Sequence, residues 1–396
     1  MKIREHLNGT ATAADPGDLL AAIPHLMGFH PQSSVVVVHV DLEERRTGTL
    51  LRLDLPAADD YESYAAQLAT RIEYGQPDGV ILVCYGDDGA PPGGGGPPPG
   101  ALAAEPSHPP DAVPGGPQAA GTAATPGVAR GELPHQALIE LVLGELTDGP
   151  VAVLGTAYVD GGRWWTYDCD HPGCCPAEGV PLPEPGLGAA ADVAARAALA
   201  GRRTLSSRRE LEDSLRGPSG ADEKAMAGVF ERVDRELAAE ALTDGVEVLR
   251  GRTLALARLL LARSAEGRLE LSDDDVARLS LGAADLLVRD RFIAFDGADP
   301  AAWLGLLTAL ARRTPDARAA AICSVVAWVA YQQGDGAVAN VALDRVLSID
   351  PRHTMAVLLR DCLDGQVSPG HITALTREAV RAAERARKEV SAAGAA

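Results

Sequence analysis

The apolar residues follow two different patterns in the two parts of this 396-residue chain. In the first part, β-branched runs at 34–40 and 79–85 predict buried strands. The segment at 49–55 alternates apolar with polar residues, which predicts a strand paired antiparallel with the first run. A helix is expected between the strands, at about 60–74. This order of elements predicts an N-terminal α/β (or α+β) domain with a mixed sheet over residues 1–180.

A helical pattern occupies the second part. Beyond a Pro-rich stretch at 181–185, the residues Ala, Leu, Arg and Glu recur at helical spacing, which predicts an all-α domain over 187–381. Ser272 and Asp275, three residues apart, resemble a capping box. They are expected to open a helix that runs to about residue 290.

Two stretches of low complexity interrupt or end these patterns. Residues 86–131 consist mainly of Gly, Pro and Ala, with too few large apolar groups to offset the entropy of ordering, so a disordered insert is expected. The sheet domain should then resume, with a helix at 134–146, a strand at 151–159 and a hairpin turn at 160–162. The charged and then Ala-rich stretch at 382–396 predicts a frayed tail.

One helical hairpin, at about 320–351, resembles the tetratricopeptide repeat. Gly334-Asp335-Gly336 is followed by apolar residues at helical spacing, and Asp350-Pro351 would end the second helix. The small residues Ala327 and Ala339 would let the two helices approach closely. We expect this single hairpin to be structural, because the surface that binds peptides in such repeats would present few hydrogen-bonding groups here.

Three segments carry a further resemblance. They are 19–31 (LLAAIPHLMGFHP), 165–179 (beginning WTYDC and ending CCPAEG) and 334–351. In composition and order they resemble the actinobacterial family catalogued as domain of unknown function 4192, and the resemblance covers nearly everything except the insert. Because that family has no established activity, the resemblance supports the fold and a cytoplasmic location but no function.

Composition and charge argue against two classes of partner. A formal net charge of −19 repels phosphate backbones, so no nucleic acid is expected as a partner. The basic cluster Arg202-Arg203 with Arg208-Arg209 is interpreted as a solvated helix start. No apolar run approaches the roughly 20 residues of a membrane span, and the N-terminus lacks a signal-peptide pattern. A cytoplasmic protein without a membrane partner is therefore expected.

The sharpest candidate site lies between the two parts. Cys169, His171, Cys174 and Cys175 offer four ligands of the types that zinc takes, within seven positions. Adjacent cysteines normally point apart, so a zinc site here would need a strained turn. Redox-active thiols are a second interpretation. The preferred one is packing of the thiols against the neighbouring tryptophans, with the two adjacent thiols diverging.

Common enzyme signatures do not accompany this cluster. The sequence has no Gly-Lys-Ser/Thr phosphate loop, no His-Glu-x-x-His helix and no Gly-x-Ser-x-Gly nucleophile elbow. We therefore expect a non-enzymatic interaction or regulatory protein with a protein partner, no catalytic residues and zinc as the one candidate cofactor. The alternative is an enzyme, with or without zinc, whose pocket lies at the sheet edge near Phe29, His30 and the cysteine corner.

Overall fold

The computed structural model describes most of the chain. The described residues are 1–4, 10–87, 131–169, 171, 174–184, 186–199, 202–265, 268, 270–294, 299–370, 372, 374, 378 and 385. The predicted insert at 86–131 therefore lies outside the described residues except at its ends. The predicted tail at 382–396 lies outside them except for residue 385.

A mixed sheet of eight strands, counted over the described residues, forms the first half in the order β2-β1-β4-β3-β5-β6-β7-β8. The strands are β1 (Lys2–Arg4), β2 (Thr10–Thr12), β3 (Ser34–Asp41), β4 (Arg46–Asp54), β5 (Gly79–Tyr85), β6 (Ala152–Asp160), β7 (Arg163–Thr166) and β8 (Val180–Pro181). At its centre β3 pairs antiparallel with β4 and β5, and β5 pairs parallel with β6. The expected mixed sheet is thus confirmed. The sequence pattern does not predict β1, β2 or β8, because two or three residues are too few to show a period.

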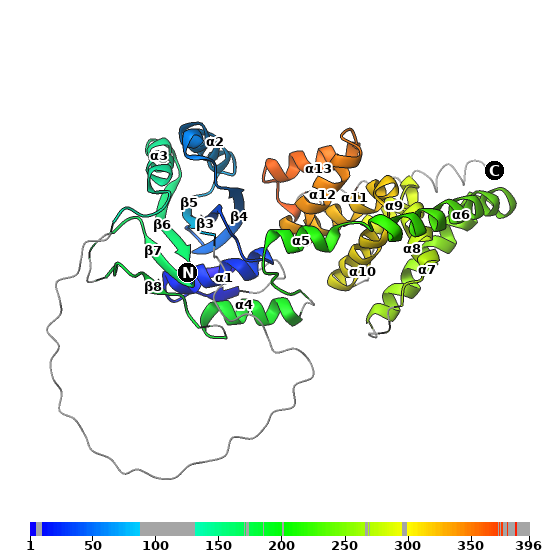
Figure 1. Ribbon diagram of the computed structural model, residues 1–396, viewed down its shortest axis with the longest axis horizontal. Coiled ribbons are helices and arrows are strands. Elements are labelled where there is room, and N and C mark those ends of the chain that lie inside the picture. The colour runs from blue at the N-terminus through cyan, green and yellow to red at the C-terminus, as the bar shows by residue number, and fades with distance from the viewer. Residues whose placement is uncertain are drawn as a thin grey trace, which may run out of the picture.

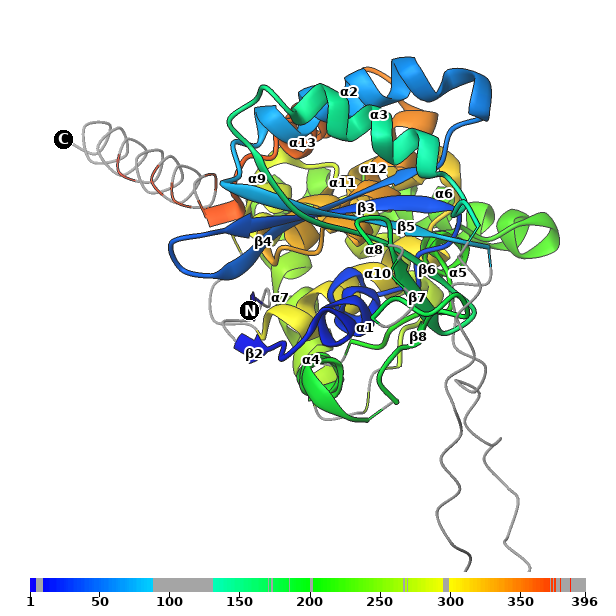
Figure 2. The same ribbon diagram turned by 90° about the vertical axis from the view of Figure 1, so that its left-hand side faces the viewer.

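Helices cover both faces of this sheet. They are α1 (Pro16–Met27), α2 (Tyr61–Tyr74), α3 (Gln136–Leu146) and α4 (Gly188–Leu199). Helices α2 and α3 lie on one face, and α1 and α4 lie on the other (Figures 1 and 2). Alternate residues of β3 face the two helical layers. Val35 and Val37 pack with α2 and α3, whereas Val36 and Val38 pack with α1. A central strand buried on both faces explains its unbroken apolar sequence.

The second half is helical, as expected. Its helices are α5 (Arg208–Leu215), α6 (Gly220–Asp244), α7 (Val246–Ala265), α8 (Asp273–Gly282), α9 (Leu286–Ile293), α10 (Pro300–Arg313), α11 (Asp316–Gln332), α12 (Gly336–Ile349) and α13 (Thr354–Asp364). Below, "sheet half" denotes β1–β8 with α1–α4, and "helical half" denotes α5–α13. The two halves lie side by side along the long axis of the molecule (Figure 1). None of the helices in the described ranges is long and apolar enough to cross a membrane.

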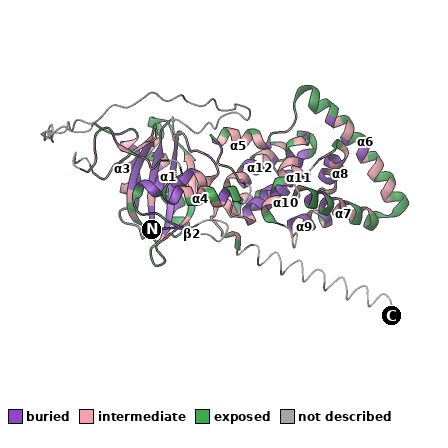
Figure 3. Ribbon diagram, turned by 90° about the horizontal axis from the view of Figure 1, so that it is seen from below, coloured by how far each residue is buried: buried purple, intermediate pink, exposed green. Residues whose placement is uncertain are grey.

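Helix α11 lies at the centre of the helical half. It contacts α8, α9, α10, α12 and α13 and is buried along most of its length, whereas the outer ends of α6 and α7 are exposed (Figure 3). Ala327 and Ala339 are fully buried where α11 packs on α12, so the closely packed hairpin has the small residues that it needs. Ser324 and Val325, which a peptide-binding repeat would present, are also buried. This burial supports a structural role for the hairpin.

The prediction of one continuous helix to about residue 290 is wrong. The capping box of Ser272 and Asp275 is present and opens α8, but α8 ends at Gly282. Helix α9 then begins with its own cap, because the Asp285 carboxylate accepts hydrogen bonds from the Leu287 and Val288 amides at 2.9 and 3.3 Å. The apolar period alone would continue one helix, but Asp285 caps the start of a new helix and so divides the segment into two.

Candidate ligand cavity and cysteine corner

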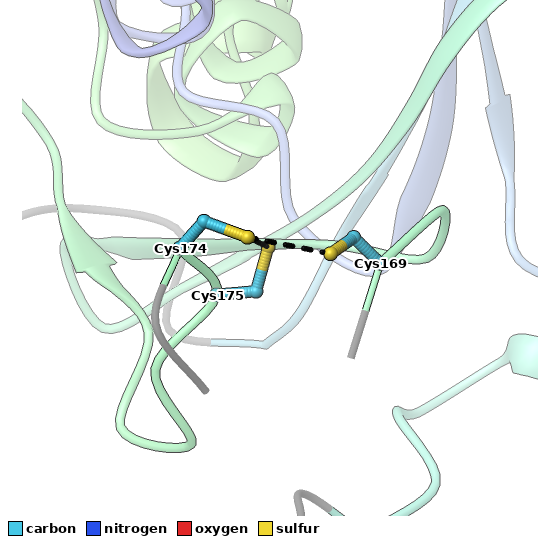
Figure 4. Close-up of side chains that lie close together, drawn as sticks. All are labelled: Cys169, Cys174 and Cys175. Atoms are coloured by element: carbon cyan, nitrogen blue, oxygen red, sulfur yellow. Dashed lines mark hydrogen bonds between the residues drawn. The ribbon is translucent and has the colours of Figure 1, made fainter. Parts of the chain in front are cut away.

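The cysteine corner, residues 167–179, follows β7 at one edge of the sheet. Here the Sγ atom of Cys174 lies 3.5 Å from that of Cys169 and 3.8 Å from that of Cys175. The three side chains point toward one another (Figure 4), and all three sulfur atoms lie within 4.8 Å of one another. The imidazole of His171 is not among the groups that converge. The structure thus brings together three of the four predicted ligands.

The expected divergence of the two adjacent thiols is wrong. Cys174 and Cys175 lie in a tight turn, in which their amides donate hydrogen bonds to the carbonyl oxygen of His171 at 3.2 and 2.8 Å. Only extended backbone sends consecutive side chains to opposite faces. The turn instead lets both thiols face Cys169.

Burial opposes ionisation of Cys175. Burial raises the pKa of Cys175 to about 12, with further contributions from hydrogen bonds to Cys169 and Cys174 and from the repulsion that a second thiolate would add. A redox-active cysteine instead needs a lowered pKa, because the thiolate is the nucleophile. The pKa of Cys175 is therefore shifted away from the range of a redox-active thiol.

A separate cavity of about 300 Å³ lies where the two halves meet. Its lining comes from residues 25–28 at the end of α1, residues 202–205, and parts of α5, α10 and the start of α12. The segments are joined directly, since the Leu205 amide donates to the Gly28 carbonyl at 2.8 Å and the His30 amide donates to the Leu205 carbonyl at 3.0 Å. None of its lining residues belongs to the cysteine corner. The cavity thus adjoins the segment that contains Phe29 and His30, although neither residue lines it, and it lies apart from the corner.

One wall of the cavity carries a neutral hydrogen-bonding pair. The Nδ1 atom of His25 lies 2.7 Å from the Thr204 hydroxyl oxygen. Burial, and then the nearby His30, lower the pKa of His25 below its ordinary value. The imidazole is consequently neutral at neutral pH and can exchange hydrogen bonds with a ligand.

The lining also carries a charged pair. Arg202 Nη1 lies 4.0 Å from Asp335 Oδ2, and the other carboxylate oxygen of Asp335 accepts a hydrogen bond from the Val338 amide at 3.1 Å. Burial raises the pKa of Asp335, while the Val338 amide and Arg202 oppose that change. The Nε atom of Arg202 is buried and has no hydrogen-bond partner among the described residues. A guanidinium in this state has a donor available for a ligand.

A comparison with known protein families identifies the family of this chain. A family model described as "Domain of unknown function (DUF4192)" matches residues 16–370. The chain belongs to this family. The match contains strands β3 to β8, the corner and the cavity. No curated protein and no solved structure matches the chain.

In this DUF4192 chain, Arg202 is the site residue that sequence reasoning missed. The interpretation of the basic cluster as a solvated helix start fits Arg203, which pairs with Glu210 at 3.1 Å, and Arg208, which pairs with Glu212 at 3.0 Å. Arg202 instead turns into the cavity. A signal was available, because the family-like stretches 19–31 and 334–351 both supply lining residues.

Proposed function

We propose that this DUF4192 protein is a non-enzymatic regulatory protein that binds a small anionic molecule. The binding site is the cavity where the two halves meet, called the junction cavity below. The observation that carries the proposal is the buried Nε of Arg202, a donor without a partner among the described residues, in a cavity between the two halves. A buried polar group without a hydrogen bond costs about 1–3 kcal/mol, and a bound anion would remove that cost.

The chemistry of the lining favours a carboxylate or phosphate group. A guanidinium binds either group through two parallel hydrogen bonds, which a single Asp335 oxygen at 4.0 Å does not provide. His25 and Thr204 could hold an uncharged part of the same molecule. The cavity, at about 300 Å³, is at the lower end of the range for small-molecule sites, so a small metabolite fits best.

A regulatory role follows from the position of the cavity. A ligand that contacts both halves stabilises the arrangement in which they meet. A partner protein that binds preferentially to that arrangement then binds more tightly when the ligand is present. The exposed apolar residues at the turn between α6 and α7 support a protein partner. Leu242 there is 90% exposed, and Val246 and Val248 are each 46% exposed.

The test compares two arginines of the same basic cluster, Arg202 and Arg209. Thermal unfolding would be followed with phosphate, succinate and citrate as probes, because a ligand that binds the folded state raises the melting temperature. We expect at least one anion to stabilise the parent and Arg202→Gln to weaken that binding roughly tenfold or more. Arg209→Gln is the matched control, because Arg209 is exposed and does not line the cavity. Equal losses in both variants, or no stabilisation by any of the anions, would contradict the proposal.

An enzyme remains the second candidate, and the pair of His25 and Thr204 favours it. A neutral imidazole 2.7 Å from a hydroxyl can act as a general base toward it. The two functions differ in the fate of the ligand. An NMR spectrum of the stabilising anion after long incubation shows one unchanged species for a binding protein and a new species for an enzyme.

A further inference from the structure

We infer that Cys169, Cys174 and Cys175 bind one zinc ion through their three thiolates, with His171 as the fourth ligand. This inference is independent of the junction cavity, because no residue of the corner lines it. Zinc is the metal that suits such a ligand set, since thiolate and imidazole are soft or borderline donors and Zn²⁺ accepts four of them.

The spacing of the sulfur atoms matches a tetrahedral site. Two thiolates that each lie about 2.3 Å from zinc, with a tetrahedral angle between them, are about 3.8 Å apart. The measured separations are 3.5 Å between Cys169 and Cys174 and 3.8 Å between Cys174 and Cys175. All three sulfur atoms lie within 4.8 Å of one another. Small adjustments would therefore place an ion among them.

The first cysteine is held in place from β6. Asp168, directly before Cys169, accepts hydrogen bonds from the amide and the hydroxyl of Thr156 at 2.9 and 2.7 Å. Its own amide donates to the Thr166 hydroxyl at 3.0 Å. These contacts fix the backbone at the point where the chain leaves β7, and with it the direction of the Cys169 side chain.

The other two cysteines are held by the segment that follows them. The Trp165 indole donates to the Ala177 carbonyl at 3.0 Å, and Arg163 donates to the carbonyls of Glu178 and Gly179 at 2.6 and 2.9 Å. Gly179 adopts a φ of +75°, and a Cβ atom there would come within 2.4 Å of the Trp165 ring. Both ends of the loop are thus tied to β7, so its thiols face one another before any ion binds.

Packing alone explains these thiols poorly. Cysteines that act as small apolar groups are buried, and Cys84 and Cys323 are both 0% exposed. At the corner Cys174 is exposed, and Cys169 and Cys175 are half-buried. Three thiols that converge at a surface bury little apolar area, whereas they satisfy the geometry of a metal site.

The fourth ligand is assigned to His171 by its place in the turn. Its carbonyl oxygen already accepts hydrogen bonds from the amides of Cys174 and Cys175, so the backbone of His171 lies next to that of the two cysteines. Its imidazole must rotate toward the thiols when the ion binds. Binding converts three thiols to thiolates and releases three protons to solvent, while the neutral imidazole donates a lone pair.

The experiment measures metal in the full chain, purified without a metal-affinity column. Mass spectrometry of the metal content should give about one zinc per chain for the parent, and a loss of about tenfold or more for Cys169→Ala and Cys174→Ala. Cys362→Ala is the control, because this half-buried cysteine lies outside the corner. Circular dichroism checks that each variant is folded.

Cobalt titration of the metal-free parent provides a second measurement that needs no cysteine variant. Tetrahedral Co²⁺ bound by thiolates gives strong visible and sulfur-to-metal absorption bands, and we expect saturation at one equivalent. His171→Ala should keep the bands with several-fold weaker binding. A parent without zinc that gives no bands with cobalt would overturn the inference, and so would a loss of metal in Cys362→Ala equal to that in Cys169→Ala. Unchanged cobalt affinity in His171→Ala would refute the fourth ligand.

Discussion

The cysteine corner draws its three converging thiols from residues 169–175, whereas the junction cavity draws its lining from segments between residue 25 and residue 338. Hydrogen bonds within a short hairpin hold the corner, and its geometry follows from one turn. The cavity exists only because α1, the segment 202–205, α5, α10 and the hairpin of α11 and α12 meet. The two sites should therefore respond differently to changes in long-range packing.

This difference has an energetic basis. The corner buries little apolar surface, so it depends on local hydrogen bonds that contribute about 1 kcal/mol each. The cavity depends on apolar contacts between the halves. Chief among them is Phe29, which follows α1 in the sequence, is 2% exposed and packs in the core of the helical half.

The largest expected effect comes from removing that contact. Phe29→Ala should lower the free energy of unfolding by about 3–5 kcal/mol, since it leaves a cavity in the core. Phe29→Leu, which keeps most of the volume, should cost less than about 1.5 kcal/mol. Denaturant unfolding followed by circular dichroism measures both. A loss below about 1 kcal/mol for Phe29→Ala would mean that the two halves meet without this anchor.

A smaller effect is expected on acidification. Burial lowers the pKa of His39, which is 6% exposed on β3, from 6.5 to about 4. Because the unfolded chain binds the proton more tightly, stability is complete above about pH 6.5 and is lost as the pH falls toward 4. The loss between pH 7 and pH 5 should be about 2 kcal/mol.

The same measurement distinguishes the contribution of His39, in the sheet, from that of His25, which lines the cavity. His39→Leu should remove most of the acid sensitivity, and the remainder should come from His25 and His135, whose pKa values burial lowers in the same direction. Unfolding curves at several pH values provide the test. If His39→Leu loses as much stability on acidification as the parent, His39 is not the group responsible.

The smallest expected effect concerns the corner. Asp168→Ala removes its two bonds to Thr156 and should cost only about 1–2 kcal/mol of global stability, because the corner is local. It should leave anion binding in the cavity unchanged. Thr156→Val, which removes one of the same bonds from the other side, is the matched variant. A loss above about 3 kcal/mol would show that the corner supports the whole fold.

Several elements could be predicted from local sequence. The runs at 34–40 and 79–85 are β3 and β5, and the capping box at Ser272 opens α8. The end of that helix was wrong because Asp285 offers a competing cap. The convergence of Cys174 and Cys175 was also missed, since a turn and an extended chain place adjacent side chains differently and the sequence does not reveal which is present.

The sequence alone predicted the class of the sheet, the helical second half, the family and the close spacing of the corner cysteines, because each is indicated by hydrophobic periods or motifs that are local in the chain. Only the tertiary structure decided that the pocket lies apart from the corner, and that Arg202 faces Asp335 while Arg203 faces Glu210. Neighbouring arginines look alike in sequence. Their roles differ because packing between distant segments buries the Nε atom of the Arg202 guanidinium beside Asp335 and leaves the Arg203 side chain 80% exposed.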